Sequence, residues 1–329
     1  MTASLSLELL VLAAAGGAFG ASIGALPSFA LAGLFVVFGE VADLTARAAG
    51  AGLPLDITGS IGFGVVLGPH VAFGGGAAAL AYASKRGSVN GIDAKAVTRG
   101  LGNRPDVLAV GGAFGVAGHL IATASAGLNI PVDPVALGVV GSALVHRAVF
   151  GYHIVGAGPF SLGTATARAD GGPAADHWLP YQQDWAAVAG LGVVMGLLGA
   201  YLAYLTASPF LAVGLSVVAL ALLCADVSRI PVTHHMTLPA STAALALAGP
   251  GALTPAAVAG GVSLGAALLV GAAFGLVGGL LGELLQRVFY ARAETHLDPP
   301  AASIVVTSFA IAVLALAGVL PSAVWIPLP

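Results

Sequence analysis

Residues 28–37 read SFALAGLFVV, and residues 209–218 read PFLAVGLSVV. A second similar pair lies further along the chain, VGGAFG at 110–115 and VGAAFG at 270–275. Because both pairs occur in the same order, the sequence predicts a unit that is present twice.

Further matches extend the two predicted units outward from these stretches. Three more pairs are in register, Gly16/Gly20/Gly24 with Gly192/Gly196/Gly199, LPLD at 53–56 with IPVT at 230–233, and Asp133-Pro134 with Asp298-Pro299. A chain rich in alanine and glycine can produce one such match by chance, but five matches in one order indicate an internal repeat.

The composition indicates which solvent this chain folds in. Of its 329 residues 58% are hydrophobic and 8% are charged, whereas a soluble domain is typically about 25% charged. A hydrocarbon core needs roughly 20 apolar residues per helix, and strand-like alternation is absent. Ten helical membrane spans are predicted at 7–25, 27–43, 57–83, 107–126, 133–158, 186–206, 209–226, 235–250, 257–289 and 298–319.

The predicted fold is therefore all-α, with ten transmembrane helices in two five-helix repeats. An odd number of spans makes the second repeat enter from the opposite side, which gives inverted repeats. We expect the first repeat at residues 1–160, a cytoplasmic linker at 161–185 and the second repeat at 186–329.

The distribution of basic residues supports this topology. If the polar loop 84–106 is cytoplasmic, nearly all basic residues of the loops and adjoining helix ends fall on the same side, and Arg47 alone falls in an outside loop. That is the positive-inside pattern. It predicts a multi-pass protein of the cell membrane whose two termini lie outside and whose surrounding partner is the lipid bilayer.

Several functional classes are disfavoured. The net charge of −3 and the lack of a basic run with aromatic residues argue against nucleic acid. The single cysteine, Cys224, excludes an internal disulfide and a cysteine-rich metal site. No nucleophile–base set or phosphate-binding loop is visible, so we expect neither an enzyme nor a bound cofactor, apart from Na⁺ as a transported ion.

Ionisable residues inside a membrane are costly and are therefore the candidates for function. The candidates for an ion or substrate pathway are Asp56, His70, His119, Asp133, His146, Arg147, His234, His235 and Asp298.

Two candidate regions contain a proline within a predicted span. His70 follows Pro69 and precedes a run of glycines at 74–76, so the third span is either a broken helix whose carbonyls and His70 line a cavity, or a kinked packing helix. Pro239 is expected to interrupt the eighth span in the same way. His234 and His235 point to different helix faces, and we expect them to cap this helix or to line the inner mouth of a pathway.

The other candidates are weighed against purely structural roles. Asp133 and Asp298, each followed by proline, are typical helix N-caps, although a helix that starts within the membrane could use such an aspartate to bind a cation. Arg147 lies deep enough to need a partner or to snorkel. His146 and His153 are expected to share a helix face, and Glu283 with Arg287 to form a solvated pair at a helix end.

Some stretches resemble a known family. LNIPV at 128–132, followed by GSALVH at 141–146, resembles a span of the E subunit of archaeal tetrahydromethanopterin S-methyltransferase. GVVMGLLGAYLAY at 192–204 resembles the start of its C subunit, and PHVAFGGG at 69–76 its D subunit. The resemblance implies a fused, duplicated relative of membrane subunits that couple methyl transfer to sodium movement, and it implies cation translocation rather than methyltransferase activity.

Three functions remain open from the sequence. The first is transport of a small cation, Na⁺ above all, between two inverted halves. The second is a membrane anchor or scaffold in a larger complex, with a soluble partner docked on loop 84–106. The third is a channel for a neutral solute of the urea or ammonia type, lined by His70 and His119. The small-residue helix faces also suggest a homo-oligomer, which the resemblance implies is a trimer.

Overall fold

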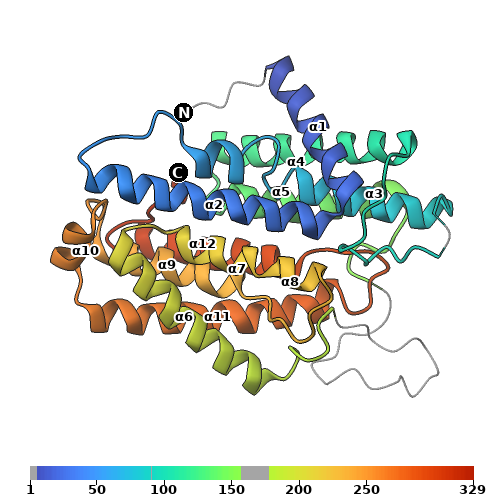
Figure 1. Cartoon of the computed structure of the whole chain (residues 1–329). Coiled ribbons are helices and arrows are strands. Elements are labelled where there is room, and N and C mark those ends of the chain that lie inside the picture. Colours follow the sequence, from blue (N-terminus) through green and yellow to red (C-terminus); the bar gives the residue numbers. More distant parts are fainter. Residues whose placement is uncertain (1–5, 90, 157–177) are drawn as a thin grey trace.

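A computed structural model describes residues 6–89, 91–156 and 178–329, and in these ranges the chain forms helices and connecting loops without a β-strand (Figure 1). The first part contains α1 (Leu7–Ile23), α2 (Ala25–Ala48), the short π-helix η1 (Thr58–Gly62), α3 (Ala72–Arg86), α4 (Pro105–Gly127) and α5 (Pro134–Phe150). The second contains α6 (Trp185–Thr206), α7 (Leu211–Val218), α8 (Leu220–Cys224), α9 (His234–Ala248), α10 (Pro255–Gly261), α11 (Leu264–Phe289) and α12 (Pro299–Leu316).

Five of the described helices are long and apolar enough to cross a membrane, namely α2, α4, α6, α11 and α12. Their outward faces carry large apolar side chains. Leu269 on α11 is 75% exposed and Val194 on α6 is 59% exposed. Apolar surface of this extent is typical of contact with lipid or with another protein. The chain is therefore an all-helical protein with the character of a membrane protein.

The two Asp-Pro pairs mark the starts of helices, as the sequence predicted. The Asp133 carboxylate accepts hydrogen bonds from the backbone N–H groups of Val135 and Ala136, and Asp298 accepts one from Ala301. Proline follows each aspartate at the first helical position, where a missing N–H costs nothing. The capping role of both aspartates is confirmed.

The third predicted span is broken, and the eighth is continuous. Helical structure stops after Gly62 and resumes at Ala72, and Gly64, Gly68 and Pro69 lie in that gap. The prediction of a broken helix is therefore confirmed for the third span. It is wrong for the eighth span, because α9 contains Pro239 but no glycine and remains helical through it.

Glycines set the closest approaches between helices. A Cβ atom added at Gly17 of α1 would lie 2.1 Å from the carbonyl oxygen of Gly111 on α4. One added at Gly196 of α6 would lie 2.3 Å from the carbonyl oxygen of Gly271 on α11. Only hydrogen fits at these positions, so the backbones touch directly, as is common where lipid removes the hydrophobic drive for helix association.

Two antiparallel contacts join the first part of the chain to the second. Residue Gly33 of α2 meets Val217 of α7, and Gly214 of α7 meets Val36 of α2. In α5 and α12, the backbone N–H of Asp133 donates to the Ser308 hydroxyl at 2.9 Å. Figure 1 shows α2 lying along α7 and α8 between the remaining helices of the two parts.

We predict that Gly17→Ala and Gly196→Ala each lower the unfolding temperature of the detergent-solubilised protein. Each added methyl overlaps a carbonyl oxygen, and overpacking costs about 1–3 kcal/mol. Gly190→Ala on α6 is the matched control, because nothing lies within 4 Å of its added Cβ. Alanine favours the helix there by up to about 1 kcal/mol, so a comparable loss of stability in all three variants would contradict the packing argument.

Candidate functional site

A cavity of about 400 Å³ lies between the two parts of the chain, and it is called the central cavity below. Its polar lining consists of Glu40, Asp56, Thr58, Asp133, His234 and Asp298. Its aromatic lining consists of Phe29, Phe63, Phe73, Phe210 and Trp325. The described residues that line it include no lysine and no arginine, so the charged groups on its wall are carboxylates.

Two of these carboxylates belong to helix N-caps that are buried inside the protein. Asp133 and Asp298 are each 6% exposed, so α5 and α12 begin at the cavity wall and not at the surface. The Asp298 carboxylate also lies 3.4 Å from Nε2 of His296. Helices that start inside the protein direct the partial positive charge of their N-termini toward such groups.

Glu40 on α2 is a site residue that the sequence reasoning missed. Its buried carboxylate accepts a hydrogen bond from the Thr58 hydroxyl at 2.7 Å and another from the hydroxyl of Ser208. These contacts connect α2 to η1 and to the turn before α7. The available signal was an acidic residue within a predicted apolar span, which by itself marks a functional candidate.

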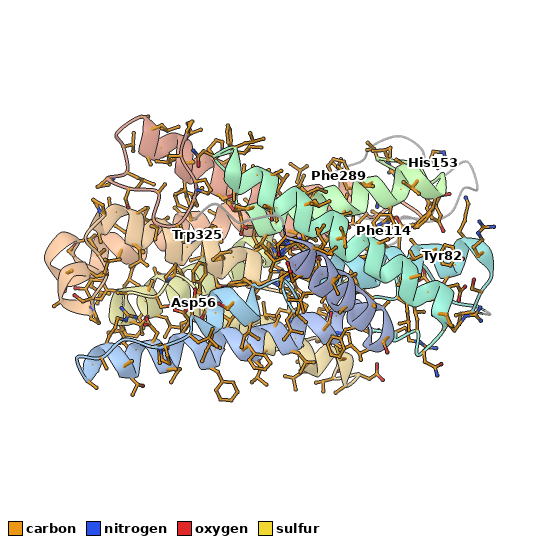
Figure 2. All side chains as sticks on the ribbon, turned by 90° about the horizontal axis from the view of Figure 1, so that it is seen from above. Asp56, Tyr82, Phe114, His153, Phe289 and Trp325 are labelled. Carbon is orange, nitrogen blue, oxygen red and sulfur yellow. The ribbon has the colours of Figure 1, made fainter. Side chains whose placement is uncertain are left out.

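Asp56 and Trp325 lie on the same cavity although they are far apart in sequence (Figure 2). The Asp56 carboxylate is exposed and accepts a hydrogen bond from the backbone N–H of Gly59 at 2.8 Å. The indole Nε1–H of Trp325 donates to the Thr242 hydroxyl at 3.1 Å, which fixes the orientation of the ring. The central cavity therefore extends from an exposed carboxylate to buried ones.

The aromatic lining forms two groups. In one group the ring centroids of Phe63 and Phe210 are 5.5 Å apart, and those of Phe210 and Trp325 are 5.4 Å apart. In the other, Phe29 lies 6.0 Å from Phe73 and 5.2 Å from the ring of His234. The second group is buried, and the His234 imidazole packs against it on the cavity wall.

The adjacent histidines of α9 face different spaces, as predicted. His234 is 3% exposed and lines the central cavity, and its Nδ1 atom has no hydrogen-bond partner among the described residues. His235 lines a separate space of about 30 Å³ together with Glu283 and Gln286. The two side chains therefore do not form a common ligand set.

His70 and His119 lie together away from the central cavity. Their rings stack at 6.3 Å, and both residues are buried. Pro69 lines the cavity in place of its neighbour. The helix break thus brings Pro69 to the cavity wall, while the His70 side chain packs against His119 of α4.

Arg147 has backbone partners in place of a carboxylate. It is fully buried, and its guanidinium donates to the carbonyl oxygens of Ile154, Phe289 and Thr295 at 2.6–2.8 Å and to the Thr295 hydroxyl at 3.0 Å. The Thr295 hydroxyl also lies 3.1 Å from Nε2 of His146. Both residues therefore hold the α11–α12 loop against α5.

Two predictions, the shared helix face of His146 and His153 and the solvation of the Glu283–Arg287 pair, are wrong. His153 does not continue the helix face of His146, because α5 ends at Phe150, and its ring instead lies 3.0 Å from the Glu294 carboxylate at an exposed end of the molecule (Figure 2). Glu283 and Arg287 do pair, at 2.6 Å, but their side chains are buried and not solvated. Arg287 also donates to the Gln183 carbonyl oxygen, so the segment before α6 covers the pair.

We predict that Arg147→Lys strongly destabilises the protein. Lysine lacks the planar guanidinium that reaches several acceptors at once, and each carbonyl oxygen left unpaired costs about 1–3 kcal/mol. Thermal unfolding of the purified protein measures the effect, and Arg99→Lys at an exposed position is the control. Equal stabilities for the two variants would show that Arg147 does not anchor this loop.

Residues 161–177 of the predicted linker lie outside the described residues. They include the polar residues Arg168, Asp170, Asp176 and His177.

Comparisons with known proteins place the chain in one family. Neither the curated proteins nor the solved structures contain a match. All of residues 1–329 match DUF7973, which is described as a family of unknown function. Because this match covers the whole chain, the protein belongs to the DUF7973 family.

Proposed function

We propose that this protein is an integral membrane transport protein that moves a small cation through the central cavity, between two inverted five-helix halves. The observation that carries the proposal is the cavity itself. Residues of both halves line it, its charged groups are carboxylates, and two of these are buried helix N-caps at corresponding positions. Transporters with inverted repeats place their substrate sites at such a repeat interface.

The packing of the helices supports two related halves. In the first part α1 packs on α3 and α4, and α4 packs on α5. In the second part α6 packs on α9 and α11, and α11 packs on α12. The same neighbours therefore recur in the same order, with α10 as an addition to the second half. Under this proposal α7 and α8 together correspond to α2.

Reciprocal contacts support a two-fold relation between the halves. Gly33 meets Val217 and Gly214 meets Val36, and these are corresponding positions of the two stretches that began the sequence comparison. At a two-fold axis, if position i of one half contacts position j of the other, then position j of the first half contacts position i of the second. Because the two helices are antiparallel, this axis runs across them, and the halves would enter the membrane from opposite sides.

Charge supports the orientation. Lys85 and Arg86 end α3, and the Lys95 ammonium donates to the Tyr290 carbonyl oxygen in the α11–α12 loop. Arg47 lies at the opposite end, where it donates to the Leu253 carbonyl oxygen beside α10. The end with most basic residues would be cytoplasmic under the positive-inside rule. Ten passes and outside termini follow in this proposal, with the cell membrane as the location.

The lining favours a cation over an anion or a neutral solute. Acidic groups in a water-poor cavity lower the energy of a cation and raise that of an anion. Na⁺ is the ion to which the resemblance to methyltransferase membrane subunits points. A neutral-solute pore lined by His70 and His119 has less support, because those rings stack on each other away from the cavity.

Cation flux into proteoliposomes tests the proposal. We expect the intact protein to carry ²²Na⁺ or a competing cation, and Asp133→Asn and Asp298→Asn each to reduce the flux at least about tenfold. Asparagine caps helices about as well as aspartate, so these variants remove charge without removing the cap.

Asp184→Asn is the matched control, because Asp184 caps α6 and does not line the central cavity. Flux that is unchanged in both cavity variants would contradict the proposal. A protein that carries no cation but purifies with a soluble subunit would instead support a scaffold that uses loop 84–106.

A further inference from the structure

We infer that the central cavity binds a protonated organic amine, with the ammonium group between its carboxylates and its aromatic wall. This inference rests on the proposed cation transport and names the class of cation. It follows from the size of the cavity, from its aromatic lining and from the carboxylate at its buried end.

The size fits an organic molecule. The cavity has a volume of about 400 Å³, which would hold roughly a dozen water molecules. Binding sites for small organic ligands span about 300–1,000 Å³ and are mostly apolar with a few placed polar groups. A bare metal ion needs several oxygen ligands at about 2–2.6 Å. No three His, Cys, Asp or Glu side chains of the described ranges converge in that way.

The aromatic lining fits a cation with apolar substituents. Only 7% of the residues in the chain are aromatic, yet five of them line this one space. Phe29 and Phe73 stand edge to face in the buried group, and Phe63, Phe210 and Trp325 form the other. Aromatic faces attract ammonium groups, and the attraction strengthens where water is excluded. A wall of leucine and valine would fill the same volume without this effect.

The polar groups at the buried end fit an ammonium group. Asp298 is 6% exposed and presents a carboxylate to the cavity. His234, 3% exposed, lies on the same wall. A buried charge without a partner of opposite charge is costly. The charge of a protonated amine would offset that of Asp298.

The position of these groups also suggests how one molecule could use both features. The Phe29 ring lies 5.2 Å from His234, and the Phe73 ring lies 5.5 Å from His296, which in turn contacts Asp298. Both members of the buried aromatic pair therefore contact a histidine near the polar end of the cavity. An ammonium at that end would leave its organic part toward Phe210 and Trp325.

Calorimetric titration of the full chain in detergent with two matched probes tests the inference. Benzylamine is protonated at neutral pH, and benzyl alcohol has a similar shape without the charge. We expect benzylamine to bind at least about tenfold more tightly than benzyl alcohol. Asp298→Asn and Phe73→Leu should each weaken benzylamine binding by about tenfold. Leucine nearly conserves volume at position 73 and removes the aromatic face.

Control variants keep the test specific. Asp184→Asn and Phe309→Leu change the same residue types outside the cavity, at the cap of α6 and on the exposed face of α12, and should leave binding unchanged. If Asp298→Asn does not fold, Phe29→Leu provides a second cavity variant. Equal binding of the two probes, or benzylamine binding that survives both cavity substitutions, would overturn the inference.

The outcomes also separate this inference from the transport proposal. Asp133- and Asp298-dependent sodium flux without benzylamine binding would overturn the amine site and leave cation transport standing. Charge-dependent benzylamine binding without flux of either cation would support the amine site and contradict transport. Replacing benzylamine with benzyltrimethylammonium tests whether the site needs an N–H donor, because that probe keeps the charge and has no N–H to donate. Unweakened binding of it would exclude a hydrogen bond from the amine to the cavity wall.

Discussion

Direct contact between helix backbones is the constraint on which the rest of this structure depends. Apolar side chains gain little by leaving lipid for a protein interior, so helix association in a membrane relies on close packing. Gly17 against Gly111, and Gly196 against Gly271, bring α1 to α4 and α6 to α11 without intervening side chains. In each part the resulting helix pair packs against a third helix, which is α3 in the first part and α9 in the second.

Buried polar side chains fix several connections between segments of the chain. Arg147 anchors the α11–α12 loop through carbonyl oxygens, and that loop leads directly to Asp298. The buried Glu283–Arg287 pair joins α11 to the segment before α6. Polar side chains of this kind are expensive inside a membrane protein. The contacts of Arg147 position the start of α12, which borders the central cavity.

Some of the candidate residues act through neighbours in the sequence, and others act through distant segments of the chain. The caps at Asp133 and Asp298 and the helix break near Pro69 were predictable, because they depend on hydrogen bonds within a few residues. The stacking of His70 on His119 was not, because it depends on the rotation of two helices about their axes. The role of Glu40 could not be predicted either, because its partners Thr58 and Ser208 come from different segments of the chain.

The sequence by itself determined the helical membrane character, the approximate helix positions and the N-caps. Composition sets the solvent in which the chain is stable, and backbone hydrogen bonding in that solvent requires helices. Only the tertiary structure decided which side chains face the central cavity. Successive residues of a helix point about 100° apart. Which of them faces the cavity therefore depends on how the helix is rotated and packed, and glycines far away in the sequence determine that packing. For that reason His234 reaches the cavity and its neighbour His235 does not.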